Sequence, residues 1–476
     1  MSTHYDAIVI GTGQAGPALA VRLAKAGRKT AINERKRFGG TCVNVGCVPT
    51  KTLVASARAA HVARTGDHFG VMIDAGFRID MARVKARKDD VVSQSTKGVE
   101  QWLRGTPNLT VIEGHARFEA PRTEGLQCVR VGDEVLEAPE IFINVGGRAS
   151  APDMPGLADV PYLNSTSVME LDHVPGHLLI IGGSYIGLEF AQMMRRFGAH
   201  VTVIEMGPRL IGREDEDVSD AIRAILEREG VEFRLDAKCL SVSKRGVGTD
   251  AGVAVSVSCD DKREDIAGTH LLLAVGRVPN TADLGLEAAG VATDARGFIA
   301  VDDQLRTSVP GIWALGDANG RGAFTHTSWN DYEIVSANLL DGGLDGKPRL
   351  VTDRIPAYAL FIDPPLGRVG MSEREVRTAY EKNGRKALRA KMAMARVGRA
   401  RERGETQGFM KILVDAETKK ILGAALLGIE GDEVIHSIID IMVADMPYTT
   451  IGRAMHIHPT VSELIPTLLE GLKPLN

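Results

Sequence analysis

The chain has 476 residues, of which 44% are hydrophobic and 25% charged, with 57 Lys and Arg against 61 Asp and Glu. At about 150 residues per domain, this length predicts roughly three domains. The net charge of −4 excludes an electrostatic footprint for nucleic acid or an anionic membrane. No apolar stretch reaches the ~20 residues of a membrane span. Five scattered cysteines do not make a secreted disulfide framework, so we expect a cytoplasmic protein.

Two segments, residues 5–34 and 177–205, repeat one plan of strand, glycine turn, helix and a short strand that ends in an acid. The turn and acid positions are Gly11, Gly13, Gly16 and Glu34 in the first segment and Gly182, Ser184, Gly187 and Glu205 in the second. Glycine lets the backbone approach a pyrophosphate, the helix N-terminus offers it N–H groups, and the acid accepts from ribose hydroxyls. An ordinary strand–turn–helix unit is the alternative, but the matched acids favour two nucleotide-binding domains.

The segment FGGTCVNVGCVPTK, residues 38–51, places Cys42 and Cys47 five residues apart, ahead of a helix that we expect to follow Pro49. At a helix start this separation can bring two sulfurs within bonding distance, and the helix N-terminus stabilises a thiolate. A structural disulfide brings little to an intracellular chain, and two ligands without a second pair make an incomplete metal site. The pattern therefore favours a redox-active pair, and we expect no resident metal.

The last third of the chain has no such glycine turn, so we expect a separate domain there. Residues 433–446 have the apolar spacing of one amphipathic helix, and Glu433 and His436 are expected to be interface residues. The basic stretch 396–403 is interleaved with Gly and Glu, which predicts a solvated strand face.

Together with the late segment HIHPTVSELIP, these motifs resemble the class I pyridine nucleotide-disulfide oxidoreductases, which include dihydrolipoamide dehydrogenase, glutathione reductase and mercuric reductase. The resemblance covers essentially the whole chain. It implies an α/β fold with two Rossmann-like dinucleotide-binding domains and a C-terminal α+β dimerisation domain. The expected limits are 1–150 and 280–347 for a discontinuous FAD domain, 151–279 for an NAD(P) domain and 348–476 for the dimerisation domain of a homodimer.

The resemblance assigns the first glycine turn and Glu34 to FAD. It adds positions expected to contact the flavin, the adenine and the sugar chain, namely Gly40, Thr41, Lys51, His115, Ala116, Gly316 and Asp317. Cys47 matches the sulfur nearest the isoalloxazine ring, and Cys42 matches the interchange thiol that attacks substrate. Lys51 and Glu189 match an ion pair near flavin N5, where a positive charge stabilises the anionic reduced flavin.

The resemblance assigns the second glycine turn, together with Gly276 and Glu189, to the pyridine nucleotide. Tyr185 matches an aromatic gate over the nicotinamide pocket. Glu205 accepts a hydrogen bond from an adenosine 2′-OH but repels a 2′-phosphate. We therefore predict NADH rather than NADPH.

In thiol-disulfide members of the family, the histidine that matches His458 protonates the departing thiolate, and the residue that matches Glu463 orients it. An imidazole that titrates near neutral pH suits this task. The family places this pair across the dimer interface, so His458 of one subunit completes the site of the other.

These roles predict that electrons pass from NADH through FAD and a Cys42–Cys47 disulfide to a small-molecule or protein disulfide or dithiol, as in dihydrolipoamide dehydrogenase. A metal-ion (mercuric or cupric) or quinone reductase that uses the same sulfurs is the alternative. A flavin-binding protein without activity is disfavoured, because it has no need of Cys42, Cys47 and His458 together.

Overall fold

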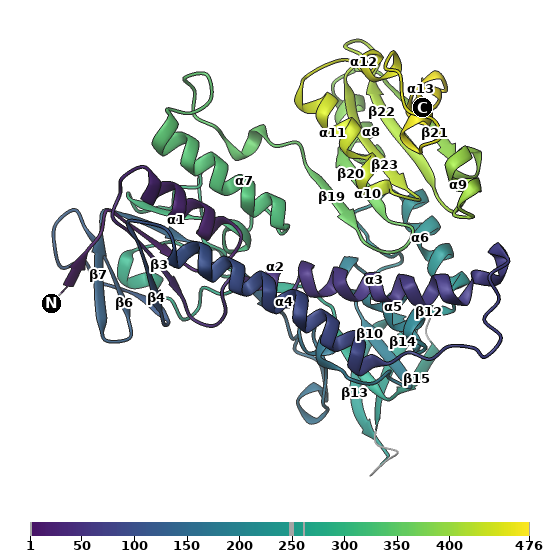
Figure 1. Ribbon diagram of the computed structural model, residues 1–476, viewed down its shortest axis with the longest axis horizontal. Helices are drawn as coiled ribbons and strands as arrows, with labels where there is room; N and C mark the ends of the chain where they lie inside the picture. The colour runs from purple at the N-terminus through teal and green to yellow at the C-terminus, as the bar shows by residue number, and fades with distance from the viewer. Residues whose placement is uncertain (1, 247–251, 260–261, 476) are drawn as a thin grey trace.

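Three main sheets organise the chain, one in each of the lobes visible in Figure 1. The computed structural model describes residues 2–246, 252–259 and 262–475. The N-terminus lies in the first lobe, and the C-terminus lies in the third lobe at the upper right of Figure 1. Within the described ranges, no helix combines the length and the apolar character that crossing a membrane requires.

The first lobe is built on a parallel sheet with strand order β18-β8-β2-β3-β4. Its strands are β2 (Ala7–Ile10), β3 (Thr30–Glu34), β4 (Leu109–Glu113), β8 (Glu140–Ile143) and β18 (Ile312–Ala314). One face packs on helices α1 (Ala15–Lys25) and α7 (Thr325–Ser336). The other packs on a second sheet of β1 (Ser2–His4), β5 (Ala116–Glu119), β6 (Gln127–Val131) and β7 (Glu134–Ala138). Alternate residues of β2 face the two layers, as the two-residue period of a strand requires.

The second lobe repeats this plan with a parallel sheet of order β12-β11-β10-β16. Its strands are β10 (His177–Ile181), β11 (His200–Ile204), β12 (Val231–Arg234) and β16 (His270–Leu273). Helices α5 (Tyr185–Phe197) and α6 (Glu216–Arg228) cover one face. The antiparallel strands β13 (Lys238–Arg245), β14 (Gly252–Cys259) and β15 (Lys262–Gly268) cover the other.

A two-stranded antiparallel ladder marks the place where the chain enters and leaves the second lobe. It pairs β9 (Gly147–Ala149) with β17 (Arg277–Pro279). Strand β18 of the first lobe comes from the sequence that follows this ladder, so the first lobe is discontinuous. The ladder lies beside the predicted limits at 150 and 280, which stay predictions.

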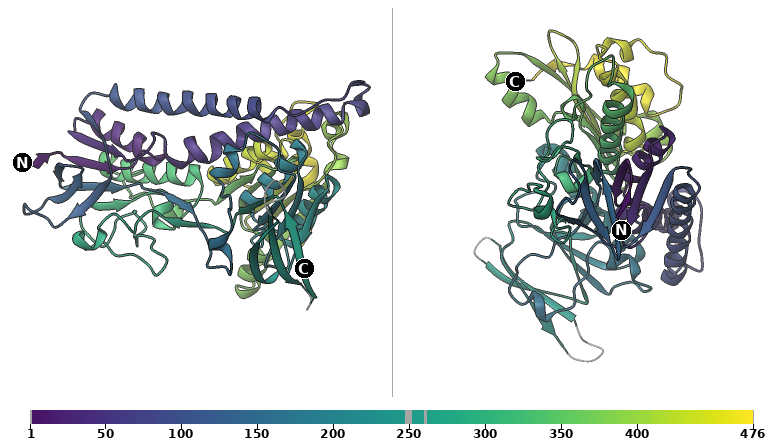
Figure 2. Two further views of the ribbon diagram at one scale, coloured as in Figure 1. Left: turned by 90° about the horizontal axis from the view of Figure 1, so that it is seen from below. Right: turned by 90° about the vertical axis from the view of Figure 1, so that its left-hand side faces the viewer.

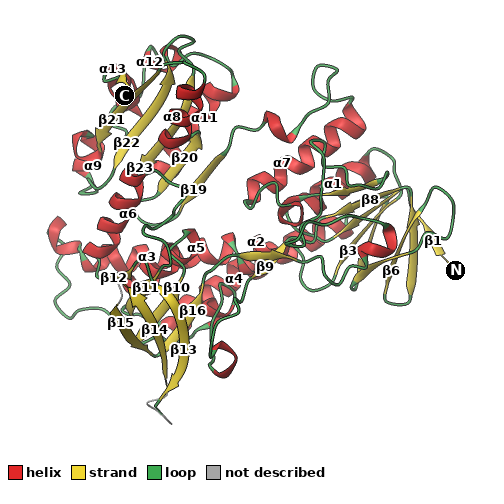
Figure 3. Cartoon of the chain, turned by 180° about the vertical axis from the view of Figure 1, so that it is seen from behind, coloured by secondary structure: helices red, strands yellow, loops and turns green. Residues whose placement is uncertain are grey.

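The third lobe contains an antiparallel sheet with strand order β19-β20-β23-β22-β21-β24 (Figure 3). The strands are β19 (Ala357–Leu360), β20 (Leu366–Gly370), β21 (Ala387–Ala393), β22 (Phe409–Asp415), β23 (Ile421–Leu427) and β24 (Lys473–Pro474). The helices of this lobe are α8 (Glu373–Lys382), α9 (Gly398–Glu402), α10 (Gly431–Val434), α11 (His436–Val443), α12 (Thr449–Gly452) and α13 (Ile465–Glu470).

Helices α3 (Cys47–Arg64) and α4 (Met81–Arg104) lie side by side and reach from the first lobe to the second (Figures 1 and 2). A short helix, α2 (Gly40–Val45), precedes them. The helix that we expected after Pro49 is present as α3, but it begins earlier than expected, at Cys47. Proline is compatible with this position, since the N–H groups of a first turn have no partner within the helix.

Two sequence predictions for the third lobe were also wrong. Residues 433–446 form parts of α10 and α11, which are separated at Ile435, in place of one helix. The stretch 396–403 forms α9 rather than a strand. Arg, Ala and Glu are strong helix formers, and Arg399 pairs with Glu402 three residues later at 3.2 Å.

A buried lysine connects the second and third lobes. The Nζ atom of Lys411 on β22 lies 2.8 Å from Asp215, 2.7 Å from Asp217 and 3.5 Å from Glu373. Only 2% of the Lys411 side chain is exposed, so its charge depends on these carboxylates.

We expect Lys411→Ala to lower the free energy of unfolding by about 3 kcal/mol or more, because it leaves the buried carboxylate of Asp215 without its cation. The matched control is Lys391→Ala, since Lys391 also pairs with Asp217, at 2.6 Å, but is 37% exposed. Its loss costs about 1 kcal/mol or less. Thermal unfolding measures both, and equal midpoints for the two variants would contradict the assignment.

Candidate active site

Both glycine turns pack too closely against a neighbouring strand end to admit a side chain. Gly11 has a φ of +100°, and a Cβ atom built on it lies 2.5 Å from a backbone oxygen. Gly182 has a φ of +112° and a corresponding distance of 2.4 Å. The last glycines of the turns, Gly16 and Gly187, are equally crowded. A Cβ atom built on each lies 2.2 or 2.1 Å from the backbone oxygen of the first glycine in its own turn. The two turns therefore share one backbone geometry.

The two acids also share one pattern of hydrogen bonds. Each carboxylate accepts two hydrogen bonds from backbone amides. One donor is the residue that follows the first glycine of the turn, and the other is the residue two positions after the acid. The distances are 3.1 and 2.9 Å at Glu34, and 2.6 and 2.8 Å at Glu205. Backbone donors thus fix both carboxylates beside their turns, and their remaining lone pairs are available to ribose hydroxyls.

One cavity of about 1650 Å³ joins the two turns and is lined by residues of all three lobes. The predicted site residues that line it are Gly11, Gly13, Glu34, Gly40, Thr41, Cys42, Cys47, Lys51, His115, Ala116, Gly182, Ser184, Tyr185, Glu189, Glu205, Gly276 and Asp317. The other predicted residues, Gly16, Gly187, Gly316, His458 and Glu463, do not line it. Glu433 and His436, expected at an interface, do line it.

The first turn fits a dinucleotide such as FAD. Beside it, Asn33 Oδ1 and Asn144 Nδ2 are buried and have no hydrogen-bond partner within the part of the chain that the structure describes. Both residues line the cavity, so a bound ligand can supply the missing partners. Asp317, whose pKa burial raises, lies 3.5 Å from Arg277 on the same wall. His115 Nε2 lies 3.0 Å from a backbone oxygen.

The two predicted redox cysteines are free thiols that both line the cavity. Cys42 lies in α2, and Cys47 is the first residue of α3. The hydrogen bond from Cys42 lowers the pKa of Cys47 to about 6, with help from Thr325 and the charge of Lys51. The same hydrogen bond, followed by burial, raises the pKa of Cys42. At neutral pH the pair therefore holds one thiolate, on Cys47, and one thiol.

An ion pair lies one helical turn beyond Cys47. Lys51 Nζ on α3 is 2.9 and 2.7 Å from the two carboxylate oxygens of Glu189 on α5. The Glu189 carboxylate also accepts from the Phe361 amide at 3.1 Å, and the Lys51 ammonium lies 4.4 Å from the centre of the Phe361 ring. All three lobes meet at this pair, and its predicted role beside the flavin stays a prediction.

The cavity is also lined by an aromatic cluster, which we did not expect as a group from the sequence. Tyr358 packs edge-on against Tyr185 at 5.5 Å and stacks on Phe324 at 5.4 Å. Phe324 also stacks with His326 at 5.4 Å. The Tyr358 hydroxyl donates to the buried carboxylate of Glu214. These residues come from distant segments with no shared spacing, so only the fold shows that they meet.

His458 and Glu463 pair with each other but lie outside the cavity. His458 Nδ1 is 3.1 and 2.9 Å from the Glu463 oxygens, and the His458 side chain is 80% exposed. The neighbouring Met455 and Ile457 are 99% and 80% exposed. Within one subunit the structure does not bring His458 to the cysteines, so its predicted role depends on a second subunit.

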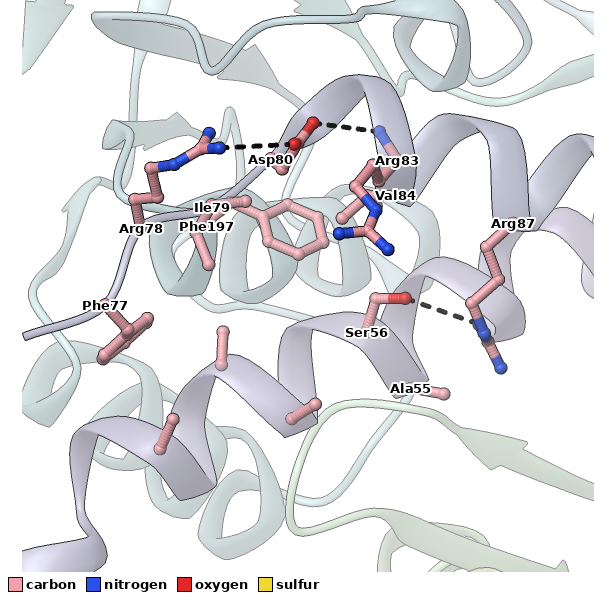
Figure 4. Close-up of a pocket in the computed structure, with 13 residues that line it drawn as sticks. Ala55, Ser56, Phe77, Arg78, Ile79, Asp80, Arg83, Val84, Arg87 and Phe197 are labelled. Carbon is pink, nitrogen blue, oxygen red and sulfur yellow. Dashed lines mark hydrogen bonds and ion pairs between the residues drawn. The ribbon is translucent and has the colours of Figure 1, made fainter. Parts of the chain in front are cut away.

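A smaller cavity of about 490 Å³ lies between α3 and the start of α4 (Figure 4). Its lining includes Ala55, Phe77 and Phe197, and Arg87 reaches Ser56 at 3.4 Å on its edge. None of the predicted site residues lines it.

Comparison with known proteins agrees with this geometry. The family described as pyridine nucleotide-disulphide oxidoreductase matches residues 5–331, and its dimerisation domain matches residues 356–469. The chain therefore belongs to the pyridine nucleotide-disulphide oxidoreductase family, as predicted. The fold class of two Rossmann-like domains and a dimerisation domain is also confirmed. The chain is a flavoprotein oxidoreductase that uses FAD and a pyridine nucleotide, and its dimerisation domain supports a homodimer.

Several relatives match over nearly their whole length. The "probable pyridine nucleotide-disulfide oxidoreductase RclA" of Escherichia coli is 37% identical over 475 residues, covering 98% of this chain and 99% of that protein. A dihydrolipoyl dehydrogenase of Cupriavidus necator is 33% identical over 478 residues, covering 98% and 97%. A mercuric reductase of Streptomyces lividans is 32% identical over 464 residues, covering 97% and 95%.

Two solved structures of one protein are also similar. They are the "HOCl-induced flavoprotein disulfide reductase RclA" of Escherichia coli and a Cu(II) complex of it. Both have a TM-score of 0.85 and 36% identity, and the match covers 98% of this chain and 99% of theirs.

We expect Gly11→Ala to reduce both FAD content and thermal stability, because its Cβ atom displaces the end of β8. Gly27→Ala is the control, since Gly27 has a φ of +87° but nothing within 4 Å of its Cβ position. Both variants carry the left-handed backbone cost of about 1–2 kcal/mol, and only Gly11→Ala adds crowding. The flavin-to-protein absorbance ratio and the unfolding midpoint measure the difference. Full FAD content in Gly11→Ala would contradict this account of the turn.

Proposed function

We propose that this enzyme passes electrons from NADH, through FAD and the Cys42–Cys47 pair, to a disulfide substrate. The observation that carries the proposal is the position of both free thiols on the wall of the cavity that contains both glycine turns, close to the ion pair of Lys51 with Glu189. The opposite pKa shifts of the two sulfurs support separate roles for them. The Escherichia coli relative is named a flavoprotein disulfide reductase, and this name is consistent with the proposed chemistry.

In the proposed reaction Cys42 attacks one sulfur of the substrate disulfide. A Cys42–substrate bond forms, the substrate S–S bond breaks, and a thiolate leaves. Because the pKa of Cys42 is raised, its thiol needs a base before it attacks. His458 of a second subunit, oriented by Glu463, accepts that proton and returns it to the leaving thiolate.

Cys47 completes the reaction as a thiolate. It attacks the Cys42 sulfur of the mixed disulfide, closes the Cys42–Cys47 disulfide, and releases the second half of the substrate, which takes up a proton. FAD, when bound, supplies the two-electron transfer from the nicotinamide that reopens the disulfide. Lys51, held by Glu189, supplies a fixed positive charge on this side of the cavity.

The predicted preference for NADH rests on Glu205. Its carboxylate is fixed by two backbone amides beside the second turn. A 2′-phosphate placed there meets a like charge, whereas a 2′-hydroxyl donates to it.

We expect Glu205→Gln to lower the ratio of kcat/KM for NADH to that for NADPH by about tenfold or more, because the repulsion of the 2′-phosphate disappears. Glu227→Gln is the control, since Glu227 lies in the same lobe and pairs with the surface residue Arg223. Steady-state kinetics with both nucleotides provide the measurement. An unchanged ratio would remove the basis for the NADH assignment.

Reduction of a metal ion such as Cu(II) is the second candidate function. The Cu(II) complex of the similar Escherichia coli protein favours it, as does the mercuric reductase among the relatives. A metal ion that accepts electrons from the thiol pair has no leaving thiolate to protonate, so this activity does not require His458.

Substitution of His458 by Ala separates the two functions. We expect His458→Ala to lower disulfide turnover by about 10²–10⁴-fold, the usual contribution of a general acid–base group, and to leave Cu(II) reduction largely unchanged. His456→Ala is the control, because His456 lies two residues before His458 and its Nδ1 atom contacts the backbone oxygen of Ala454 at 3.0 Å.

The measurement is NADH-dependent turnover with lipoamide, glutathione disulfide and Cu(II) as acceptors. Disulfide turnover that survives in Cys47→Ser would overturn the proposed function itself.

A further inference from the structure

The Cys47 sulfur contacts a side chain from a distant part of the sequence. Cys47 Sγ lies 3.1 Å from Thr325 Oγ1, across 278 residues of sequence. Thr325 is the first residue of α7, and Cys47 is the first residue of α3. The sulfur therefore lies where two helices begin, and helix N-termini favour negative charge.

The residues on either side of Thr325 are fixed in place. Phe324 stacks on Tyr358 with an interplanar angle of 7° and on His326 with an angle of 9°. His326 Nε2 donates a hydrogen bond to the backbone oxygen of Ala357 at 2.7 Å. These contacts attach the first turn of α7 to β19, so the Thr325 hydroxyl has little freedom to turn away from the sulfur.

The Thr325 hydroxyl has one proton to donate and lies 3.1 Å from the Cys47 sulfur, and a hydrogen bond from the same hydroxyl also lowers the pKa of Cys42. We infer that Thr325 is a positioning residue whose hydroxyl donates a hydrogen bond to the Cys47 thiolate and thereby keeps the negative charge on that sulfur. This inference rests on the proposed function, and it adds a residue that the sequence motifs did not identify.

Thr325 matters most when Cys42 is bonded to substrate. In the reduced pair, the Cys42 thiol also donates to Cys47. Once Cys42 forms a mixed disulfide it has no S–H, so that donor is lost. Thr325, with the charge of Lys51, then maintains Cys47 as the thiolate that attacks the Cys42 sulfur, forms the Cys42–Cys47 bond and expels the substrate thiolate.

We expect Thr325→Val, which keeps the shape of the side chain but removes the donor, to raise the Cys47 pKa by about one pH unit. The thiolate is stable above its pKa and is lost as the pH falls through it. The long-wavelength charge-transfer absorbance of the FAD-containing, two-electron-reduced protein reports it. Its midpoint is expected near pH 6 in the parent protein, given the pKa of about 6, and near pH 7 in Thr325→Val.

Two variants serve as controls. Thr325→Ser keeps a hydroxyl at the same place and is expected to keep the midpoint within a few tenths of a pH unit of the parent. Thr327→Val makes the same substitution in the same helix at a residue that does not line the cavity, and it is expected to change nothing. Thermal midpoints of all three variants exclude general unfolding as the cause of a shift.

A second measurement does not depend on the flavin band. In Cys42→Ser protein the alkylation of Cys47 by iodoacetamide, followed by peptide mass spectrometry, gives the pH of half-maximal rate. We expect that pH to rise by about one unit when Thr325→Val is added. Equal pH values with and without Thr325→Val in both titrations would overturn the inference. Absence of the charge-transfer band in the parent protein would instead count against the proposed function.

Discussion

The packing of α3 against α5 is the interaction on which the candidate site depends. Leu53 and Ala57 of α3 share a hydrophobic core with Phe190 of α5, and the ion pair of Lys51 with Glu189 lies beside this core on the wall of the cavity. Because α3 begins at Cys47, this packing fixes a redox sulfur of the first lobe next to the second lobe. The two glycine turns consequently open into one cavity instead of two separate clefts.

Features that local chemistry determines could be predicted from the sequence. The crowding at Gly11 and Gly182 and the paired amides at Glu34 and Glu205 are formed within each strand–turn–helix unit, so the motif alone indicates them. The pair of cysteines was recognisable for the same reason. The start of α3 was misplaced because Pro49 was interpreted as a helix boundary, although a first turn accepts proline.

Features that depend on tertiary contact could not be predicted. Thr325 and Tyr358 carry no motif, and their relation to Cys47 and Tyr185 exists only because α7 and β19 converge at the cavity. The basic stretch that forms α9 was mistaken for a strand because its charge pattern fits either structure on a surface. His458 lies outside the cavity, and its predicted place across a dimer interface stays a prediction.

The two sulfurs differ in a way that connects the chemistry to assembly. The hydrogen bond that lowers the pKa of Cys47 necessarily raises that of Cys42, because one proton lies between them. The pair thus gains a stable thiolate on Cys47, while the thiol of Cys42 stays protonated. The cavity is lined by His115, His326 and His436 of the same subunit, and the Nε2 atom of His326 is bonded to a backbone oxygen while burial lowers its pKa. In the proposed mechanism the base is instead His458 of a second subunit, which makes disulfide turnover depend on the dimer.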